Sequence, residues 1–332
     1  MAASRESHKP LDFTRLHMKS RAARSHKVAA DAVAGTPAAG CRFADWLASL
    51  PGYLGAKQLR ATVAAVLAAR RASRPVVFGY GGHVVKTGCS PLIVDLIQRG
   101  LITAVATNGS GAIHDLELAE TGATSEEVGE TIRDGSFGMV YETCERMAAA
   151  AARGADGRGL GRALGELLIE TKAPHAELSI MVAACRAGIP ATVHVAIGTD
   201  TVHMHAAADG AAIGAATLAD FRRVCAVVAD MAAAAPGAAG GVWINAGSAV
   251  VLPEVFLKAV SVARNLGHDL DGMHTANFDM LTQYRPTQNV VLRPVKPGQG
   301  HAVTGQHEIL LPLLRQALVE GWAQEGPRDV RT

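Results

Sequence analysis

The sequence repeats one local pattern: a short apolar run, a turn of glycine or polar residues, and a helical segment. The apolar runs are Val76–Phe78, Ala104–Thr107, Thr192–Ile197 and Val242–Ala246. Parallel strands need a long crossover between them, usually a helix. Repeated strand–turn–helix units therefore predict an α/β fold with a doubly wound parallel sheet and helices on both faces.

Other segments define the expected organisation around this sheet. Helical spacing predicts amphipathic helices at Phe43–Leu50 and Lys57–Arg71, and a linking helix at Pro91–Arg99 with proline at its first position. Residues 1–40 contain many lysines and arginines, so we expect a basic, flexible arm there. Residues 41–332 are expected to form a single domain with a helical N-terminal extension.

Composition narrows the class of protein. Of 332 residues, 49% are hydrophobic and 19% charged, and the net charge of +2 argues against nucleic acid as the main partner. No run of about 20 apolar residues is free of glycine, proline or charge, so no membrane span is expected. The cysteines are scattered without metal-ligand spacing, which predicts a reducing cytoplasm: Cys41, Cys89, Cys144, Cys185 and Cys225.

Polar residues follow each predicted strand. In a doubly wound sheet, ligands bind at the carboxyl ends of the strands, so these side chains are expected to converge on one cleft. They are His83, Lys86, Thr87, Thr107, Asn108, His114, Asp115, Thr199, Asp200, His203, His205, Asp209, Asn245, Ser248 and Glu254.

An ordered series of segments resembles deoxyhypusine synthase. They are KTGCSPLIVDLIQRG, ATNGSGAIHDLELA, GIPATVHVAIGTD, INAGSAVVLPEVF, HTANFDMLTQYRP and PLLRQAL, and they span roughly residues 49–318. The resemblance implies a Rossmann-like domain in a homotetramer, with NAD and a polyamine bound between subunits.

The resemblance also implies a set of site residues. An NAD site is implied at Thr87, Gly88, Thr107, Asn108, Gly109, Asp200, Gly247, Ser248, Thr275 and Ala276. His114 stands where a family glutamate meets the ligands, and Asp279 falls near an aspartate of the amine pocket.

One departure from the family pattern concerns a lysine. The synthases keep a lysine a few residues beyond an Arg-Pro pair, where it forms an imine with the aminobutyl group. Here Arg285-Pro286 is followed first by Arg293 and only then by Lys296. A guanidinium stays protonated and cannot act as that nucleophile, so protein-lysine aminobutylation is not expected.

The run IHDLELA is also similar to a stretch in the NAD-binding domain of ornithine cyclodeaminases. Both families begin with hydride transfer from an amine-bearing carbon to NAD. That step needs a base and groups that hold a cation. We assign catalytic roles to His114, Lys86 and Glu254, and substrate contacts to Asp115, His203, Asp279 and Arg285.

The sequence thus predicts an NAD-dependent enzyme that oxidises a small cationic amine, either a polyamine or a basic amino acid. In a second step the enzyme would transfer or rearrange the resulting imine, as deoxyhypusine and homospermidine synthases do. Two alternatives remain open: an ornithine-cyclodeaminase-like lyase, and a non-catalytic protein that binds NAD or polyamine. His203 and His205 would share a face on a strand, but we expect pocket histidines there and no metal site.

Overall fold

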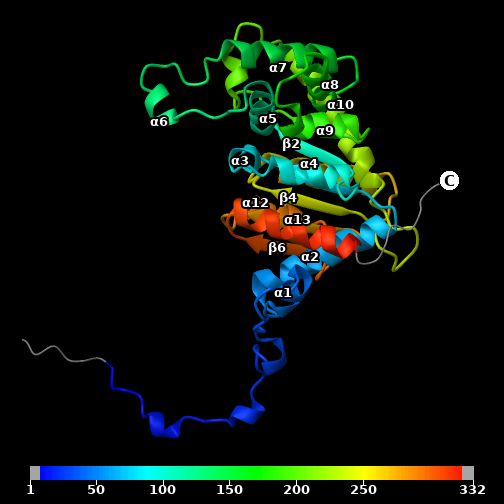
Figure 1. Ribbon diagram of the computed structural model, residues 1–332. Coiled ribbons are helices and arrows are strands. Elements are labelled where there is room, and N and C mark those ends of the chain that lie inside the picture. Colours follow the sequence, from blue (N-terminus) through cyan, green and yellow to red (C-terminus); the bar gives the residue numbers. More distant parts are fainter. Residues whose placement is uncertain (1–7, 324–332) are drawn as a thin grey trace, which may run out of the picture.

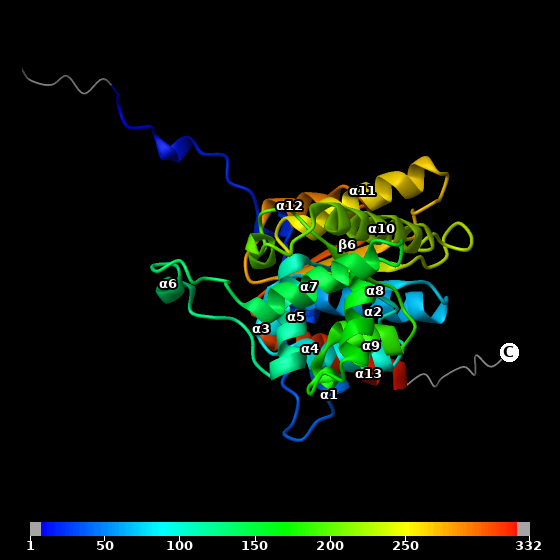
Figure 2. The same cartoon turned by 90° about the horizontal axis from the view of Figure 1, so that it is seen from above.

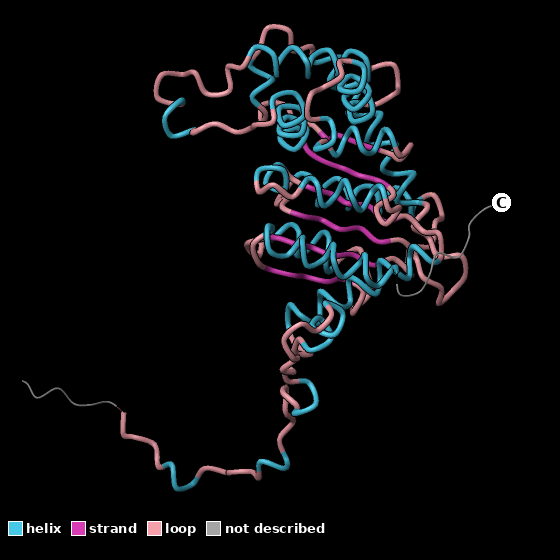
Figure 3. The backbone as a smooth tube through the Cα atoms, in the orientation of Figure 1, coloured by secondary structure: helices cyan, strands magenta, loops and turns pink. Residues whose placement is uncertain are grey.

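In the computed structural model, which describes residues 8–323, six parallel strands form one sheet (Figures 1 and 3). The strands are β1 (Val76–Tyr80), β2 (Ala104–Asn108), β3 (Ala191–His194), β4 (Val242–Ala246), β5 (His274–Asp279) and β6 (Gly300–Thr304). Their order is β3-β2-β1-β4-β5-β6, so the winding direction reverses between β1 and β4. This order confirms the predicted Rossmann-like, doubly wound fold.

Helices cover both faces of the sheet. They are α1 (Phe43–Ser49), α2 (Leu54–Arg71), α3 (Gly82–Lys86), α4 (Ser90–Gln98), α5 (Gly109–Thr121), α6 (Val128–Thr131), α7 (Tyr141–Gly154), α8 (Leu160–Glu170), α9 (Ile180–Arg186), α10 (Gly210–Ala229), α11 (Val251–Asn265), α12 (Tyr284–Pro286) and α13 (His307–Ala323). Short 3-10 turns lie at Phe13–Arg15, Arg21–Ala23, Ala30–Ala32, Ala176–Leu178 and Thr201–Met204, and a π-helical turn at Thr287–Leu292.

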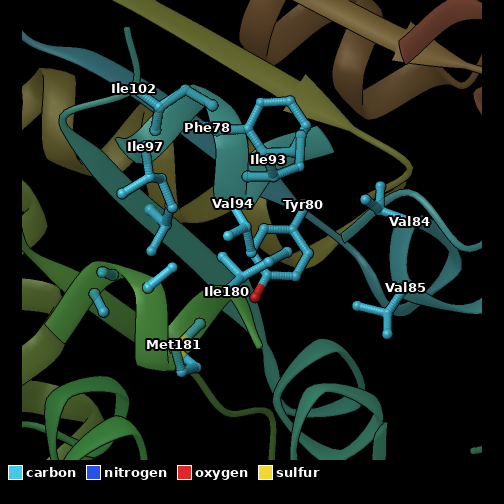
Figure 4. Close-up of a cluster of buried hydrophobic side chains, with 14 of the residues drawn as sticks. Phe78, Tyr80, Val84, Val85, Ile93, Val94, Ile97, Ile102, Ile180 and Met181 are labelled. Atoms are coloured by element: carbon cyan, nitrogen blue, oxygen red, sulfur yellow. The ribbon is translucent and has the colours of Figure 1, made fainter. Parts of the chain in front are cut away.

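The two faces of the sheet have separate apolar cores. Phe78 and Tyr80 of β1 pack with Ile93 of α4 on one face (Figure 4). On the other face Trp243 of β4 stacks on Phe256 of α11, with ring centroids 4.5 Å apart. A strand buried on both faces reads as an almost continuous apolar run, which is why β1 and β4 were visible in the sequence.

The last two strands were not predicted as strands. β5 carries polar residues, and Asn277 accepts a hydrogen bond of 2.7 Å from the side chain of Asn245 within the sheet. β6 lies at the edge, where buried and more exposed residues alternate. Their apolar signal is therefore weak. The predicted run Thr192–Ile197 is also shorter in the structure, because β3 ends at His194.

Two segments stand away from the sheet. Residues 8–40 extend from the body (Figure 1) and are almost entirely exposed, while the expected arm residues 1–7 and the terminal residues 324–332 lie outside the described part. The 122–140 segment, which contains α6, projects beside α5 and α7 (Figure 2). Within residues 8–323, no helix is long and apolar enough to cross a membrane.

Candidate active site

A cleft of about 430 Å³ lies beside the carboxyl ends of β2 and β3. Its walls come from α3, α5, the 122–140 segment, the start of α7 and the loop after β3. The polar groups that line it include Lys86, Ser110, His114, Glu117, Glu126 and Asp200. Four of the polar residues expected at the strand ends, Lys86, His114, Thr199 and Asp200, are therefore brought together here.

His114 is held in the cleft by a chain of hydrogen bonds. Its Nδ1 lies 2.7 Å from Oγ1 of Thr124, and that hydroxyl lies 2.5 Å from Oε2 of Glu117. The other carboxylate oxygen of Glu117 accepts a hydrogen bond of 3.0 Å from Thr143. An ionised carboxylate only accepts hydrogen bonds, so Thr124 donates to Glu117 and accepts from His114. This network assigns the proton of a neutral His114 to Nδ1 and leaves the lone pair on Nε2.

The surroundings of His114 keep this imidazole neutral. Burial, with a further contribution from the positive charge of Lys86, lowers the pKa of His114 to about 4, although Glu117 acts in the opposite direction. The ring also packs close to α3, since a Cβ atom added to Gly82 would lie 2.9 Å from its Cδ2. At neutral pH His114 is therefore unprotonated at Nε2, where its lone pair is free.

The start of α5 forms the floor of the cleft. Asn108 caps this helix by accepting a hydrogen bond of 2.9 Å from the backbone N–H of Gly111. The carboxylate of Asp200 lies directly against Gly109 and leaves no room for a Cβ atom there. Burial raises the pKa of Asp200. A helix of thirteen residues that begins Gly-Ser-Gly, with Lys86 in the same cleft, has the features of an anion-binding site.

His203 supports the loop that carries Asp200. Its Nδ1 accepts hydrogen bonds from the backbone N–H groups of Gly198, at 3.2 Å, and Asp200, at 3.3 Å. These contacts place the ring beneath the loop, where it orients Asp200. No group of three or more His, Cys, Asp or Glu residues within residues 8–323 is arranged to hold a metal ion.

Other predicted cofactor residues shape the turns around the sheet edge. Thr87 donates to the carbonyl of His83 at 2.9 Å, and Gly88 follows it with φ +73°. Gly247 has φ +62°, and Ser248 accepts a hydrogen bond of 3.2 Å from the backbone of α11. Thr107 is buried, with its hydroxyl donating to the carbonyl of Tyr80 at 2.8 Å.

Three predicted contact residues lie inside the fold. Asp115 is fully buried and accepts hydrogen bonds from Ser179, at 2.5 Å, and from the backbone of Ile180, at 2.7 Å. Burial raises its pKa to about 6. Thr275 and Ala276 lie in the amino-terminal half of β5, where Thr275 donates to a backbone carbonyl. The structure places these three side chains away from the cleft.

A second group of predicted residues lies beyond β4 on the same edge. Glu254 of α11 forms an ion pair with Arg285 at 3.3 Å, a close ion pair with Lys258, and a hydrogen bond with Asn289 at 2.9 Å. The hydrogen bonds and positive charges of Lys258 and Arg285 lower the pKa of Glu254. Asp279 is buried at the end of β5. None of the predicted residues in this group lines the 430 Å³ cleft.

The sequence reasoning missed part of the cleft. Thr124 and Glu126 belong to the 122–140 segment, and Thr143 lies in α7, so none comes directly after a strand. The available signal was the position of this segment directly after α5, the helix that carries His114. Lys296, in contrast, lies just before β6 and is paired with Asp271 at 2.7 Å, at the amino-terminal edge of the sheet.

The fold places this chain among Rossmann-like α/β proteins. A conserved protein from Methanococcus maripaludis S2, provisionally assigned as LOR/SDH, has a similar structure, with 16% identity and a TM-score of 0.50 over 81% of this chain and 70% of that one. A ternary complex of AgrE with ornithine and NAD+ gives 15% identity and a TM-score of 0.51 over 81% and 34%.

A provisionally assigned deoxyhypusine synthase from Entamoeba histolytica gives 10% identity and a TM-score of 0.44 over 85% and 94%. This chain spans about a third of the length of the AgrE chain and of ArgZ, an arginine dihydrolase from cyanobacteria whose structure is also similar. No protein-family model and no curated protein matches the sequence. At identities of 10–16%, these comparisons show a similar fold and nothing more.

Proposed function

We propose that this protein is an NAD-dependent enzyme that oxidises a small cationic amine in the 430 Å³ cleft. The observation that carries the proposal is the convergence of two elements on one cleft at the carboxyl edge of a Rossmann-like sheet. One is the Gly-Ser-Gly start of α5 with Lys86, and the other is the His114–Thr124–Glu117 chain.

The residues present fit NAD. The backbone N–H groups at the start of α5 and the ammonium of Lys86 suit the diphosphate, and the carboxylate of Asp200 suits a ribose hydroxyl. Bound NAD would supply the acceptor for a hydride. The similar fold of AgrE, whose complex contains ornithine and NAD+, supports this assignment.

The acidic wall of the cleft suits a cationic substrate. Glu117 and Glu126 line the cleft, and Glu142 lies on the adjoining surface, where Glu120 is paired with Arg146. Carboxylates at the entrance attract an ammonium group and hold it near His114. A polyamine or a basic amino acid such as ornithine fits this charge pattern.

His114 performs the proton transfer in this proposal. Its Nε2 takes one proton from the substrate ammonium, the adjacent C–H bond breaks as the hydride leaves, and the nitrogen lone pair forms the C=N bond. Thr124 and Glu117 keep Nδ1 protonated and the ring oriented throughout. Lys86 helps to keep His114 neutral before the transfer.

The candidate reactions differ in the fate of the imine after oxidation. Transfer of the imine carbon to a second amine gives synthase-like chemistry, and internal capture with loss of ammonia gives cyclodeaminase-like chemistry. The resemblance to ornithine cyclodeaminases and the position of Lys296 at the opposite edge favour a route without a lysine imine at that position. Glu254, Arg285 and Asp279 are proposed to contact ligands across a subunit boundary.

The test combines NAD binding with an amine panel. The purified protein is incubated with NAD and ornithine, arginine or spermidine, and products are identified by mass spectrometry. We expect NAD to raise the Tm with its concentration, and one amine to be consumed. Lys86→Gln should weaken NAD binding, whereas Lys296→Gln should leave it unchanged. No Tm shift at millimolar NAD, with and without amine, contradicts the proposal.

A further inference from the structure

A pair of histidines joins the turn after β1 to the start of α13. Nδ1 of His83 lies 2.9 Å from Nδ1 of His307, and Nε2 of His307 lies 3.1 Å from the carbonyl oxygen of Phe278. His307 is fully buried, whereas His83 is only partly covered. The contact also needs Gly247, because a Cβ atom there would lie 3.0 Å from the His307 ring.

The hydrogen bonds assign the protons of this pair. A carbonyl oxygen only accepts, so Nε2 of His307 carries a proton, and a neutral His307 offers a lone pair at Nδ1. His83 then donates from its own Nδ1 and keeps a lone pair at Nε2. A partner that fixes one imidazole nitrogen in this way decides which nitrogen takes up a proton.

His83 and His114 are linked through the same short helix. His83 belongs to α3, and His114 packs against Gly82, the first residue of that helix. Lys86, at the end of α3, exerts its charge on both imidazoles. The charges of Asp279 and Glu308 also act on His83. Both rings therefore lie within the field of one ammonium group at the carboxyl edge of the sheet.

We infer that His83, which lies beside the 430 Å³ cleft and does not line it, is a second proton-accepting residue and that His307 is its positioning residue. The inference rests on the proposed function, in which His114 takes the first proton. When water or a second amine adds to the C=N carbon, its bond to that carbon forms and the C=N electrons return to nitrogen. The proton released by the adding group passes through a water molecule to Nε2 of His83.

The first experiment needs no ligand. Long-range ¹H–¹⁵N NMR at pH 8 on the full chain labelled with ¹⁵N-histidine reports the tautomer, and the His83 signal is identified by its loss in His83→Gln. We expect a proton on Nδ1 and none on Nε2. His307→Leu should give a mixture of tautomers, whereas His307→Gln, whose amide can both donate and accept, should retain the single form.

The second experiment measures turnover with NAD and the amine found active in the panel. His83→Gln should lower kcat by about a hundredfold, as expected for loss of a proton-transfer group. His307→Leu should lower kcat about tenfold, leave KM unchanged and shift the acid limb of the pH profile downward, because a protonated His83 loses its hydrogen-bond acceptor, and His307→Gln should restore both. The pair His274–His301, at 3.3 Å near the amino-terminal edge, provides the control variant His274→Gln, with no expected effect.

Two results would overturn the inference: a proton on Nε2 of His83, or full turnover by His83→Gln. If the wild-type protein consumes none of the amines, the proposed function fails. The tautomer measurement on the protein alone then still decides whether His83 offers an accepting nitrogen.

Discussion

The carboxylate of Asp200 lies against Gly109, the first residue of α5, so closely that position 109 has no space for a Cβ atom. This contact joins the loop after β3 to the helix after β2. The two segments that bracket the proposed NAD site are therefore able to meet only because residue 109 has no side chain.

Gly109→Ala should displace Asp200 and disturb the proposed NAD site. We expect the free energy of unfolding to fall by about 1–3 kcal/mol, as for an overpacked site, and the Kd for NAD to rise. Urea unfolding and calorimetric titration measure the two effects. Gly214→Ala is the control, because that helical glycine has open space around it and should gain up to about 1 kcal/mol. Equal behaviour of the two variants would contradict the proposed contact.

Thr124→Val should interrupt the hydrogen-bond chain between His114 and Glu117. The ring then loses its acceptor at Nδ1, and we expect kcat to fall about tenfold with KM nearly unchanged. Thr124→Ser should retain most of the activity because it keeps the hydroxyl. Thr121→Val is a matched control, since Thr121 bonds to backbone carbonyls and does not contact His114. A comparable loss in both valine variants would exclude the specific role.

Asp220 should make stability depend on pH. Burial raises the pKa of this carboxyl to about 7, although Val193 and Gly161 donate backbone hydrogen bonds to it. Because the folded pKa exceeds the ordinary value of 3.8, the folded state binds more protons between pH 4 and 7. The contribution of Asp220 to stability therefore declines as pH rises through this range.

The variant Asp220→Asn lacks this titration. We expect its free energy of unfolding, relative to the wild type, to increase by roughly 2–4 kcal/mol between about pH 4 and pH 8. Urea unfolding at both pH values gives the comparison. A difference that does not change with pH would show that Asp220 does not titrate in this range.

No covalent lysine intermediate is expected at Lys296. Its ammonium pairs with Asp271 at 2.7 Å near the amino-terminal edge of the sheet, opposite the cleft. Borohydride added during turnover, with peptide mapping afterwards, should leave Lys296 unmodified. Lys86 lines the cleft and is the internal reference for a lysine within reach. An alkylated Lys296 would show that this segment moves to the active site.

A homotetramer is expected in solution. The resemblance to deoxyhypusine synthase implies active sites between subunits, and the 122–140 segment projects with Val128, Ile132 and Met139 exposed. Burial of such side chains against another copy would be favourable. Light scattering at micromolar concentration should give four times the chain mass. A stable monomer would remove the basis for ligand contacts by Asp279 and Arg285 across a boundary.

The local pattern of the sequence determined the fold class and the general location of the site. Apolar runs with glycine turns after them specify buried parallel strands and helix starts, because the signal lies within a few consecutive residues. That is why Lys86, Asn108, His114 and Asp200 could be placed at the carboxyl edge. Polar strands such as β5 could not be predicted from the sequence, because their burial depends on hydrogen-bond partners such as Asn245 on a neighbouring strand.

Tertiary structure alone decided which polar groups interact. His83 meets a histidine 224 residues further along the chain, and His114 is oriented by Thr124, which belongs to no strand or helix. Asp115 comes directly after His114, yet it points into the core and holds the start of α9. Adjacent residues on a helix face different directions, and contacts between distant segments form only when the sheet brings them together. The sequence therefore predicts which edge of the sheet carries the site. The packing of distant segments decides which side chains lie together at that edge.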